Sequence, residues 1–204
     1  MRFTFLDPGP MVDGELQLVA PEMPLIDEVL ASCAHPHTLR DAPADANVTR
    51  GKIMDFLRAA PMGRQSGEPA MGRLPAYHFW MLVRRGVGDP PIRLVGGISL
   101  RIGTNAEIES FSGNVGYHVY PPARGRHFAE RACRLILPLA RRHGMERLWI
   151  TCNPDNAASR RTCERLGAKM LDIVPIPSEH PFRMRGETAK CRFVIELTQG
   201  RPLQ

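Results

Sequence analysis

Short apolar runs alternate along this chain with segments in which apolar residues recur every three or four positions. The runs are typical of β-strands, and the periodic segments are typical of helices with one buried face. Strands are therefore expected at residues 16–20, 78–84, 94–102, 115–120, 148–152, 170–174 and 192–197. Helices are expected at residues 24–32, 49–59, 128–143 and 157–166. This order predicts an α/β domain.

Breaks in the pattern mark the connections and the helix ends. Asn47 is expected to cap the helix 49–59, and Pro138 is expected to kink the helix 128–143. Polar or Gly- and Pro-rich stretches predict a loop at 60–75, a hairpin-like connection at 86–91, a second loop at 103–114 and a loose tail at 198–204.

The composition is that of one globular domain. The chain has 204 residues, 43% of them apolar and 24% charged, which suffices for a substantial core. No apolar run approaches the roughly 20 residues that cross a bilayer, and the first ten residues lack the apolar core of a signal peptide. The five cysteines are odd in number and widely spaced, so we expect reduced thiols, a cytoplasmic location and no membrane partner. They are Cys33, Cys133, Cys152, Cys163 and Cys191.

Metal-ligating residue types gather around Cys33, His35 and His37. No second cluster completes four ligands with ordinary spacing, so we expect no metal site. The two histidines are instead expected to end the first helix, where an imidazolium suits the helix dipole.

Charge favours an anionic ligand. The net charge is +6, and only three of the 27 basic residues are lysines. Seven arginines fall between Arg124 and Arg147, and most of them are expected on a solvated helix face. Arg124 and Arg126 differ, because a turn places them.

That turn lies in residues 116–129, which read Gly-Tyr-His-Val-Tyr-Pro-Pro-Ala-Arg-Gly-Arg-His-Phe-Ala. A strand leads through prolines into an Arg-Gly-Arg loop and then into a helix. The first N–H groups of the helix, its dipole and the two arginines together predict a site for a phosphate-bearing ligand.

A second motif occupies residues 151–168, Thr-Cys-Asn-Pro-Asp-Asn-Ala-Ala-Ser-Arg-Arg-Thr-Cys-Glu-Arg-Leu-Gly-Ala. Taken alone, it is explained by Asn156 as a helix N-cap and Gly167 as a left-handed C-cap.

Together the two motifs resemble those of the GNAT superfamily of acyl-CoA-dependent N-acyltransferases. The pyrophosphate-binding motif of that family is matched by Val119, Pro121, Arg124, Gly125, Arg126, Phe128 and Ala129, with His127 standing where the family usually has glycine. The second family motif is matched by Asn156, Ser159, Glu164, Arg165 and Gly167. The resemblance covers residues 78–197 well, and the first 60 only through the order of strand and helices.

The resemblance implies a single domain, residues 1–204, with a central, mixed, splayed sheet flanked by helices. Residues 1–75 would shape the acceptor side, and residues 76–197 would bind acetyl-CoA. The pantetheine arm would enter between the strands 115–120 and 148–152.

The resemblance also assigns the ligand contacts. The pyrophosphate would lie on the backbone of Arg124, Gly125, Arg126, His127, Phe128 and Ala129. The β-carbon of His127 crowds that position, although its imidazole could donate to the phosphate. Asn156 would bind the pantetheine arm, Ser159 would lie near the thioester sulfur, and a backbone N–H at the end of the Val119 strand would hold the oxyanion.

Catalysis needs a proton acceptor for the attacking amine, and a carboxylate is the usual one. Glu109 is the candidate base, with Glu107 and Glu179 as alternatives, and each of them also fits an exposed surface charge. Many relatives place a tyrosine on the second-motif helix to protonate the leaving thiolate, but Cys163 stands there.

Ser159 or Tyr120 could replace that tyrosine, or no acid is needed because a thiolate leaves readily. Cys163 as an acyl-carrying nucleophile is an alternative to its role as small apolar core filler.

Three functions follow from the resemblance. The first is an N-acetyltransferase that moves the acetyl group of acetyl-CoA to a primary amine of a small molecule, by direct attack in a ternary complex. The second uses the same chemistry on a macromolecule: a protein N-terminus, a lysine or an aminoacyl-tRNA. No nucleic-acid partner other than this tRNA is expected. The third is a non-catalytic acyl-CoA-binding module. A homodimer is left open.

Overall fold

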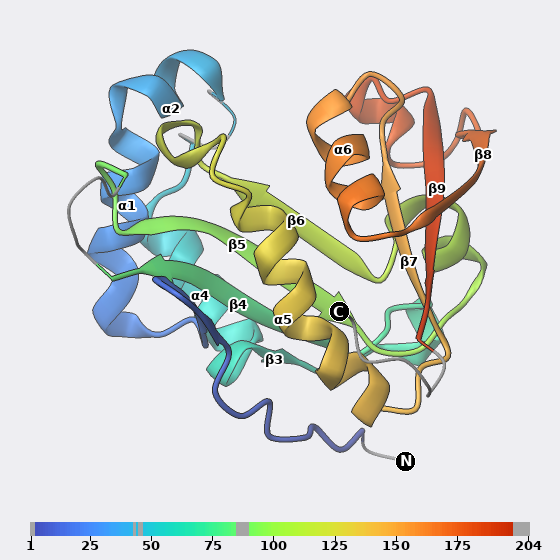
Figure 1. The fold of residues 1–204 in the computed structure, drawn as a ribbon, viewed down its shortest axis with the longest axis horizontal. Coiled ribbons are helices and arrows are strands. Elements are labelled where there is room, and N and C mark those ends of the chain that lie inside the picture. The colour runs from blue at the N-terminus through green and yellow to red at the C-terminus, as the bar shows by residue number, and fades with distance from the viewer. Residues whose placement is uncertain (1–2, 43, 45–46, 85–89, 198–204) are drawn as a thin grey trace.

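The computed structural model describes residues 3–42, 44, 47–84 and 90–197. Its strands form two sheets that lie side by side and diverge, with helices on both faces of the larger sheet (Figure 1). The expected tail at 198–204 and most of the connection at 86–91 lie outside the described residues.

The larger sheet has six strands, and each pair of neighbours is antiparallel. Its order is β1-β2-β4-β5-β6, with β3 paired to β4. The strands are β1 (Val12–Asp13), β2 (Leu16–Val19), β3 (Arg64–Gln65), β4 (Ala76–Val83), β5 (Leu94–Arg101) and β6 (Val115–Val119). β4 and β5 are buried along most of their length, which explains their continuous apolar runs.

The smaller sheet has the order β7-β9-β8, also antiparallel. Its strands are β7 (Arg147–Cys152), β8 (Lys169–Pro175) and β9 (Ala189–Glu196). The two sheets meet at the buried Asn114, whose backbone N–H donates to the carbonyl of Trp149 at 2.7 Å. Beyond this point β6 and β7 separate (Figure 1), which confirms the predicted splayed sheet.

Five described helices surround the sheets. They are α1 (Ile26–Ala34), α2 (Pro36–Asp41), α4 (Arg50–Ala59), α5 (Phe128–Arg142) and α6 (Ala157–Arg165). Single 3₁₀ turns occupy Met23–Leu25, Pro61–Gly63, Pro69–Met71, Pro121–Ala123 and Arg183–Arg185, and Ile108–Ser112 is a π-helical turn. α5 crosses one face of the larger sheet, and α4 lies behind the opposite face (Figure 1).

The helix ends correct three expectations. The N-cap of α4 is Thr49 rather than Asn47, because the Thr49 hydroxyl accepts the N–H of Lys52 at 3.3 Å. The predicted helix 24–32 corresponds to α1, and a second helix that was not predicted follows it, which His35 starts by accepting the N–H of His37 at 3.2 Å. The histidines therefore open a helix instead of closing one.

The two predicted loops also contain regular structure. Arg64 and Gln65, inside the stretch 60–75, pair with β4 as a short edge strand. The stretch 103–114 contains the π-helical turn. Polar composition hid both elements, since an edge strand and a surface turn bury few side chains.

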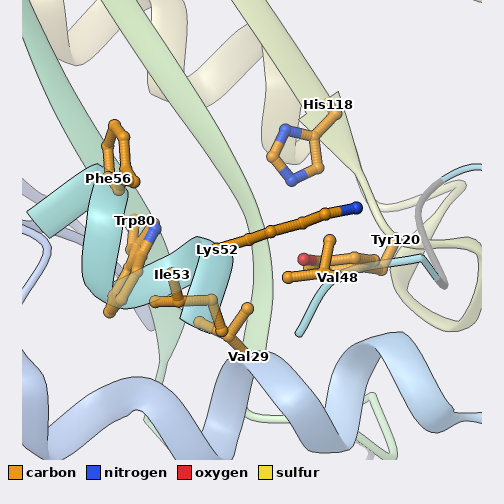
Figure 2. Close-up of a pocket in the computed structure, with 8 residues that line it drawn as sticks. All are labelled: Val29, Val48, Lys52, Ile53, Phe56, Trp80, His118 and Tyr120. Atoms are coloured by element: carbon orange, nitrogen blue, oxygen red, sulfur yellow. The ribbon is translucent and has the colours of Figure 1, made fainter. Parts of the chain in front are cut away.

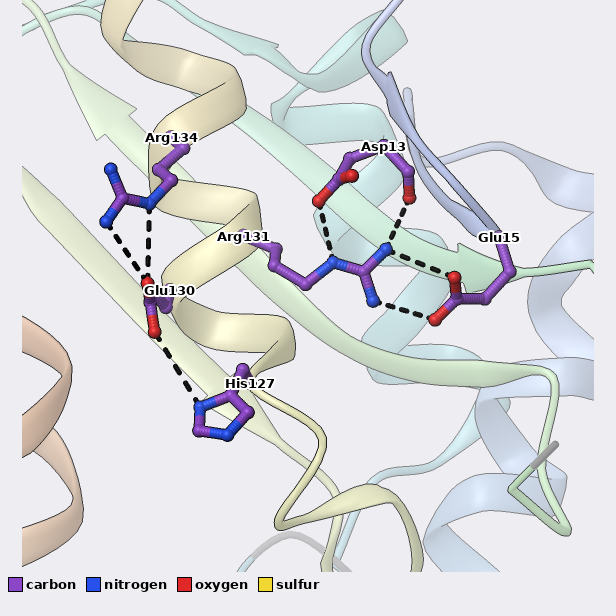
Figure 3. Close-up of polar contacts among 6 residues, drawn as sticks. All are labelled: Asp13, Glu15, His127, Glu130, Arg131 and Arg134. Carbon is purple, nitrogen blue, oxygen red and sulfur yellow. Dashed lines mark hydrogen bonds and ion pairs between the residues drawn. The ribbon is translucent and has the colours of Figure 1, made fainter. Parts of the chain in front are cut away.

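Polar contacts fasten α5 to the hairpin β1–β2 (Figure 3). Arg131 donates to the carboxylates of Asp13, at 2.6 Å, and Glu15, at 2.7 Å. Arg131 also lies over the ring of Phe128, and α5 is buried in the main core through Phe128, Cys133 and Ile136. The five cysteines are all buried free thiols, and none of the helices among the described residues is long and apolar enough to cross a membrane.

Candidate active site

The loop before α5 is built by two residues in the left-handed region. Gly125 has φ of 84° and His127 has φ of 58°. His127 is the N-cap of α5 but forms no side-chain cap hydrogen bond, so it leaves the first N–H groups of the helix to other acceptors. The exposed Arg124 folds back toward the strand and donates from Nε to the carbonyl of Val119 at 3.1 Å. The geometry fits a bound phosphate group.

The His127 side chain turns toward α6. Its Nδ1 accepts a hydrogen bond from Arg165 at 3.2 Å and lies 3.7 Å from a carboxylate oxygen of Glu130 (Figure 3). A side chain at positive φ costs of the order of 1 kcal/mol relative to glycine. These contacts offset part of that cost and hold the imidazole at the α5–α6 boundary.

Asn156 performs the structural role that its motif predicts. Its Oδ1 accepts the N–H of Ser159 at 3.0 Å and so caps α6. Because the cap uses Oδ1, a contact with a pantetheine arm would come from the Nδ2 amide of Asn156.

The sequence interpretation missed a tyrosine beside Ser159. The Tyr117 hydroxyl lies 2.8 Å from Oγ of Ser159. Burial raises the pKa of Tyr117, which keeps the phenol protonated. Burial also raises the pKa of the Cys163 thiol to about 12, so this thiol is a poor nucleophile. Strand alternation was the signal available, because it places Tyr117 and His118 on opposite faces.

His118 lies over the small residue Gly97. The two residues are paired across β5 and β6, and a β-carbon on Gly97 would lie 2.9 Å from Cε1 of His118. Glycine is therefore required for the imidazole to take this position.

A pocket of about 300 Å³ opens beside His118 (Figure 2). α1, α4, β4 and β6 contribute to it. It is lined by Val29, Val48, Lys52, Ile53, Phe56, Trp80, His118 and Tyr120. A second hollow of about 370 Å³ adjoins it, sharing Phe56, Trp80 and His118 and extending along the sheet to Gly116 and Tyr117.

His78 is a second imidazole in the adjoining hollow. Burial, with the Arg101 charge nearby, lowers the pKa of His78 to about 4. His78 also lies 2.9 Å from the side-chain oxygen of Gln65. It is therefore a weak base, whereas His118 lines both hollows.

The predicted catalytic residues occupy three separate places. Ser159 lies at the start of α6, whereas Tyr120 lines the pocket beside His118, with its hydroxyl 3.4 Å from Sγ of Cys33. Glu109 accepts a hydrogen bond from Thr104 at 2.9 Å and lines neither hollow. Glu107 lies 3.0 Å from the imidazole of His180. The carboxylate base thus stays a prediction without support from this geometry.

Residues 25–169 match the family described as acetyltransferase (GNAT) domain. The chain belongs to the GNAT family of acetyltransferases. This family membership confirms the resemblance, and with it an acyltransferase that uses acetyl-CoA as co-substrate. The residues that the structure describes contain no cluster of side chains able to hold a metal ion.

Solved GNAT structures share the fold across nearly the whole chain. A candidate ribosomal-protein-serine acetyltransferase from Vibrio cholerae is 20% identical, with 94% of this chain and 99% of that chain covered and a TM-score of 0.62. The microcin C7 self-immunity acetyltransferase MccE, solved with acetyl-CoA and AMP, is 15% identical. The match covers 90% of this chain and 93% of that chain, with a TM-score of 0.65.

The ribosomal L7/L12 α-N-protein acetyltransferase RimL, solved with coenzyme A, is 14% identical. The match covers 92% of this chain and 97% of that chain, with a TM-score of 0.61. No curated protein sequence matches the chain significantly. At these identities the GNAT structures show the fold, and the acceptor must be argued from this chain's own residues.

Proposed function

We propose that this GNAT enzyme acetylates the primary amine of a small molecule by direct attack in a ternary complex. The main support for this proposal is the placement of two consecutive residues of β6, Tyr117 and His118. Tyr117 is hydrogen-bonded to Ser159 on one face, and His118 lines the pocket on the other. An acid and a base are thus available on the two sides of one strand.

Each residue has one task in this proposal. His118 accepts a proton from the attacking amine nitrogen while the N–C bond forms. Tyr117 donates its proton to the sulfur while the C–S bond of the thioester breaks. Acetyl-CoA supplies the acyl carbon and the leaving thiolate, held by the backbone of residues 124–129 and by Asn156.

A small acceptor is supported by the size of the pocket. About 300 Å³ is at the lower end of the roughly 300–1,000 Å³ found for small-molecule sites. The apolar residues that α1 and α4 contribute to the pocket would enclose a compact ligand, and they do not form an extended surface of the kind that binds a protein. A protein N-terminus is the second candidate, because RimL and the Vibrio cholerae protein, both named for ribosomal-protein substrates, share the fold.

Paired variants test the proposal. His118→Gln should lower kcat about 100-fold with a primary amine and leave the affinity for acetyl-CoA within about twofold. Glu109→Gln, the matched change at the carboxylate, should retain most of the activity. The reverse ranking would assign the base to Glu109. Acetylation of peptides but of no free amine would replace the small acceptor with a protein N-terminus.

A further inference from the structure

The acceptor pocket contains one ammonium group, that of Lys52, within a largely apolar and aromatic lining. Figure 2 shows the Lys52 side chain stretched from α4 across the pocket, toward the side where His118 and Tyr120 lie. Its Nζ donates to the backbone carbonyl of Asn47 at 2.9 Å, which directs the side chain. Lys52 is exposed, so a ligand in the pocket can reach its charge.

Helix stability does not explain a lysine at this position. Lys52 lies in the first turn of α4, whose N-cap is Thr49, and the helix dipole disfavours a cation there. Arg50 in the same turn is paired with Asp27, but no ion pair found among the described residues gives Lys52 a carboxylate. The side chains described as lining the two hollows likewise include no Asp or Glu.

We infer that the acceptor is an α-amino acid with an apolar side chain of about the size of leucine or phenylalanine. This inference rests on the proposed function, since it assigns the amine to His118. Lys52 and His118 line the same small pocket, so the anion and the amine of the ligand are separated by few bonds. A carboxylate pairs with the Lys52 ammonium through a charge-assisted hydrogen bond.

The remaining walls fit the side chain of such an amino acid. Ile53 and Trp80 are buried, and Phe56 is half-buried; Phe56 and Trp80 also line the adjoining hollow. An aromatic or branched side chain removes apolar surface from water against these residues. A polyamine would instead bring a second positive charge toward Lys52, which disfavours its binding.

Matched amines and matched lysine variants test this inference. L-phenylalanine and 2-phenylethylamine differ by the carboxylate alone, and acetylation of each is followed with acetyl-CoA in excess. Lys52→Met removes the charge and keeps the hydrocarbon stem. Lys169→Met, at an exposed lysine of β8 that lines neither hollow, is the control.

We expect kcat/KM of the unmodified enzyme to favour L-phenylalanine by about tenfold or more. Lys52→Met should remove that preference, because it should raise KM for L-phenylalanine much more than KM for 2-phenylethylamine. Lys169→Met should change neither. Equal use of both amines, or an equal loss for both in Lys52→Met, would overturn the inference while leaving the proposed function intact.

A binding measurement keeps the inference testable if neither amine is acetylated. Thermal shifts of the CoA-saturated protein are then compared for N-acetyl-L-phenylalanine and N-acetyl-2-phenylethylamine. A larger shift for the anionic compound that disappears in Lys52→Met supports the ligand class, even though the proposed function has failed. Equal or absent shifts overturn the ligand class as well.

Discussion

The phenol oxygen of Tyr117 lies 2.8 Å from Oγ of Ser159, so a hydrogen bond joins β6 to the first turn of α6 beyond the point where the two sheets separate. Strand and helix come from opposite sides of that separation. The pair therefore holds the Tyr117 hydroxyl in one position, which in the proposed mechanism is beside the thioester sulfur.

Replacing Tyr117 by Phe should lower kcat by about 10- to 100-fold while the Kd of acetyl-CoA changes by less than about threefold. The phenylalanine keeps the ring that packs at this position and removes the proton. Stopped-flow or steady-state turnover, together with calorimetry of acetyl-CoA binding, measures the two effects separately. Unchanged turnover would show that the thiolate leaves without a dedicated acid.

Ser159→Ala provides the companion measurement. If Ser159 orients the phenol, this change should lower kcat less than Tyr117→Phe, and the double variant should be no slower than Tyr117→Phe alone. Additive losses would mean that the serine acts on the thioester independently of Tyr117.

The loop before α5 should bind acetyl-CoA through its backbone and its arginines. Arg124→Ala or Arg126→Ala should weaken binding by a few-fold, more at low salt than at high salt. His127→Gly should bind at least as tightly, because glycine removes the β-carbon that crowds the expected phosphate position. Titration by calorimetry checks all three. A large loss in His127→Gly would show that the imidazole itself contacts the phosphate.

Cys163→Ala should leave turnover within about threefold and lower stability by about 1–2 kcal/mol. The thiol is fully buried, and burial raises its pKa to about 12, so little thiolate exists at neutral pH. Activity assays and thermal denaturation give the two numbers. A covalent acetyl adduct on intact-protein mass spectra, absent from Cys163→Ala, would establish a relay through this thiol instead.

The pair Glu15–Arg131 should make stability depend on acid. The hydrogen bond from Arg131 lowers the pKa of the Glu15 carboxyl from 4.5 to about 2. The folded state thus favours the carboxylate, so the stabilisation is present in full above pH 4.5 and is lost as the pH falls toward 2.

Arg131→Ala should remove about 1 kcal/mol at pH 7, allowing for solvent screening of an exposed pair, and should flatten the acid limb of the stability curve. Urea denaturation across this pH range measures both. Arg134→Ala, on the same helix but paired with Glu130, should retain the acid dependence that Glu15 causes. If Arg131→Ala leaves the loss of stability at low pH unchanged, that loss comes from other carboxyl groups.

The sequence was sufficient for the elements that its local chemistry controls. A strand, prolines and an Arg-Gly-Arg turn before an apolar helix predict the strand, turn and helix that the structure has, while the anion site around Gly125 stays a prediction. The cap by Asn156 was equally readable, because an N-cap interacts with N–H groups only three residues away.

Contacts between distant segments were not readable in this way. Strand alternation separates Tyr117 from His118, but only packing decides which of them meets α6. Glu109 was plausible as a base because it precedes β6, yet its side chain turns to Thr104. Asn47 and Thr49 are both residue types that cap helices well. The choice depends on where α4 begins, and it begins at Arg50, directly after Thr49.

The junction at Asn114 has a consequence for the energetics of ligand entry. Its side-chain amide donates to the carbonyls of Arg101, at 3.1 Å, and Gly103, at 2.8 Å, while its Oδ1 accepts the N–H of Trp149 at 2.8 Å. Aspartate would lose both donors, and leucine all three bonds. Because this one amide joins β7 to the larger sheet where β6 and β7 diverge, it fixes the separation of these two strands in the free protein. If acetyl-CoA binds between them, as we expect, no strand-opening penalty reduces its binding energy.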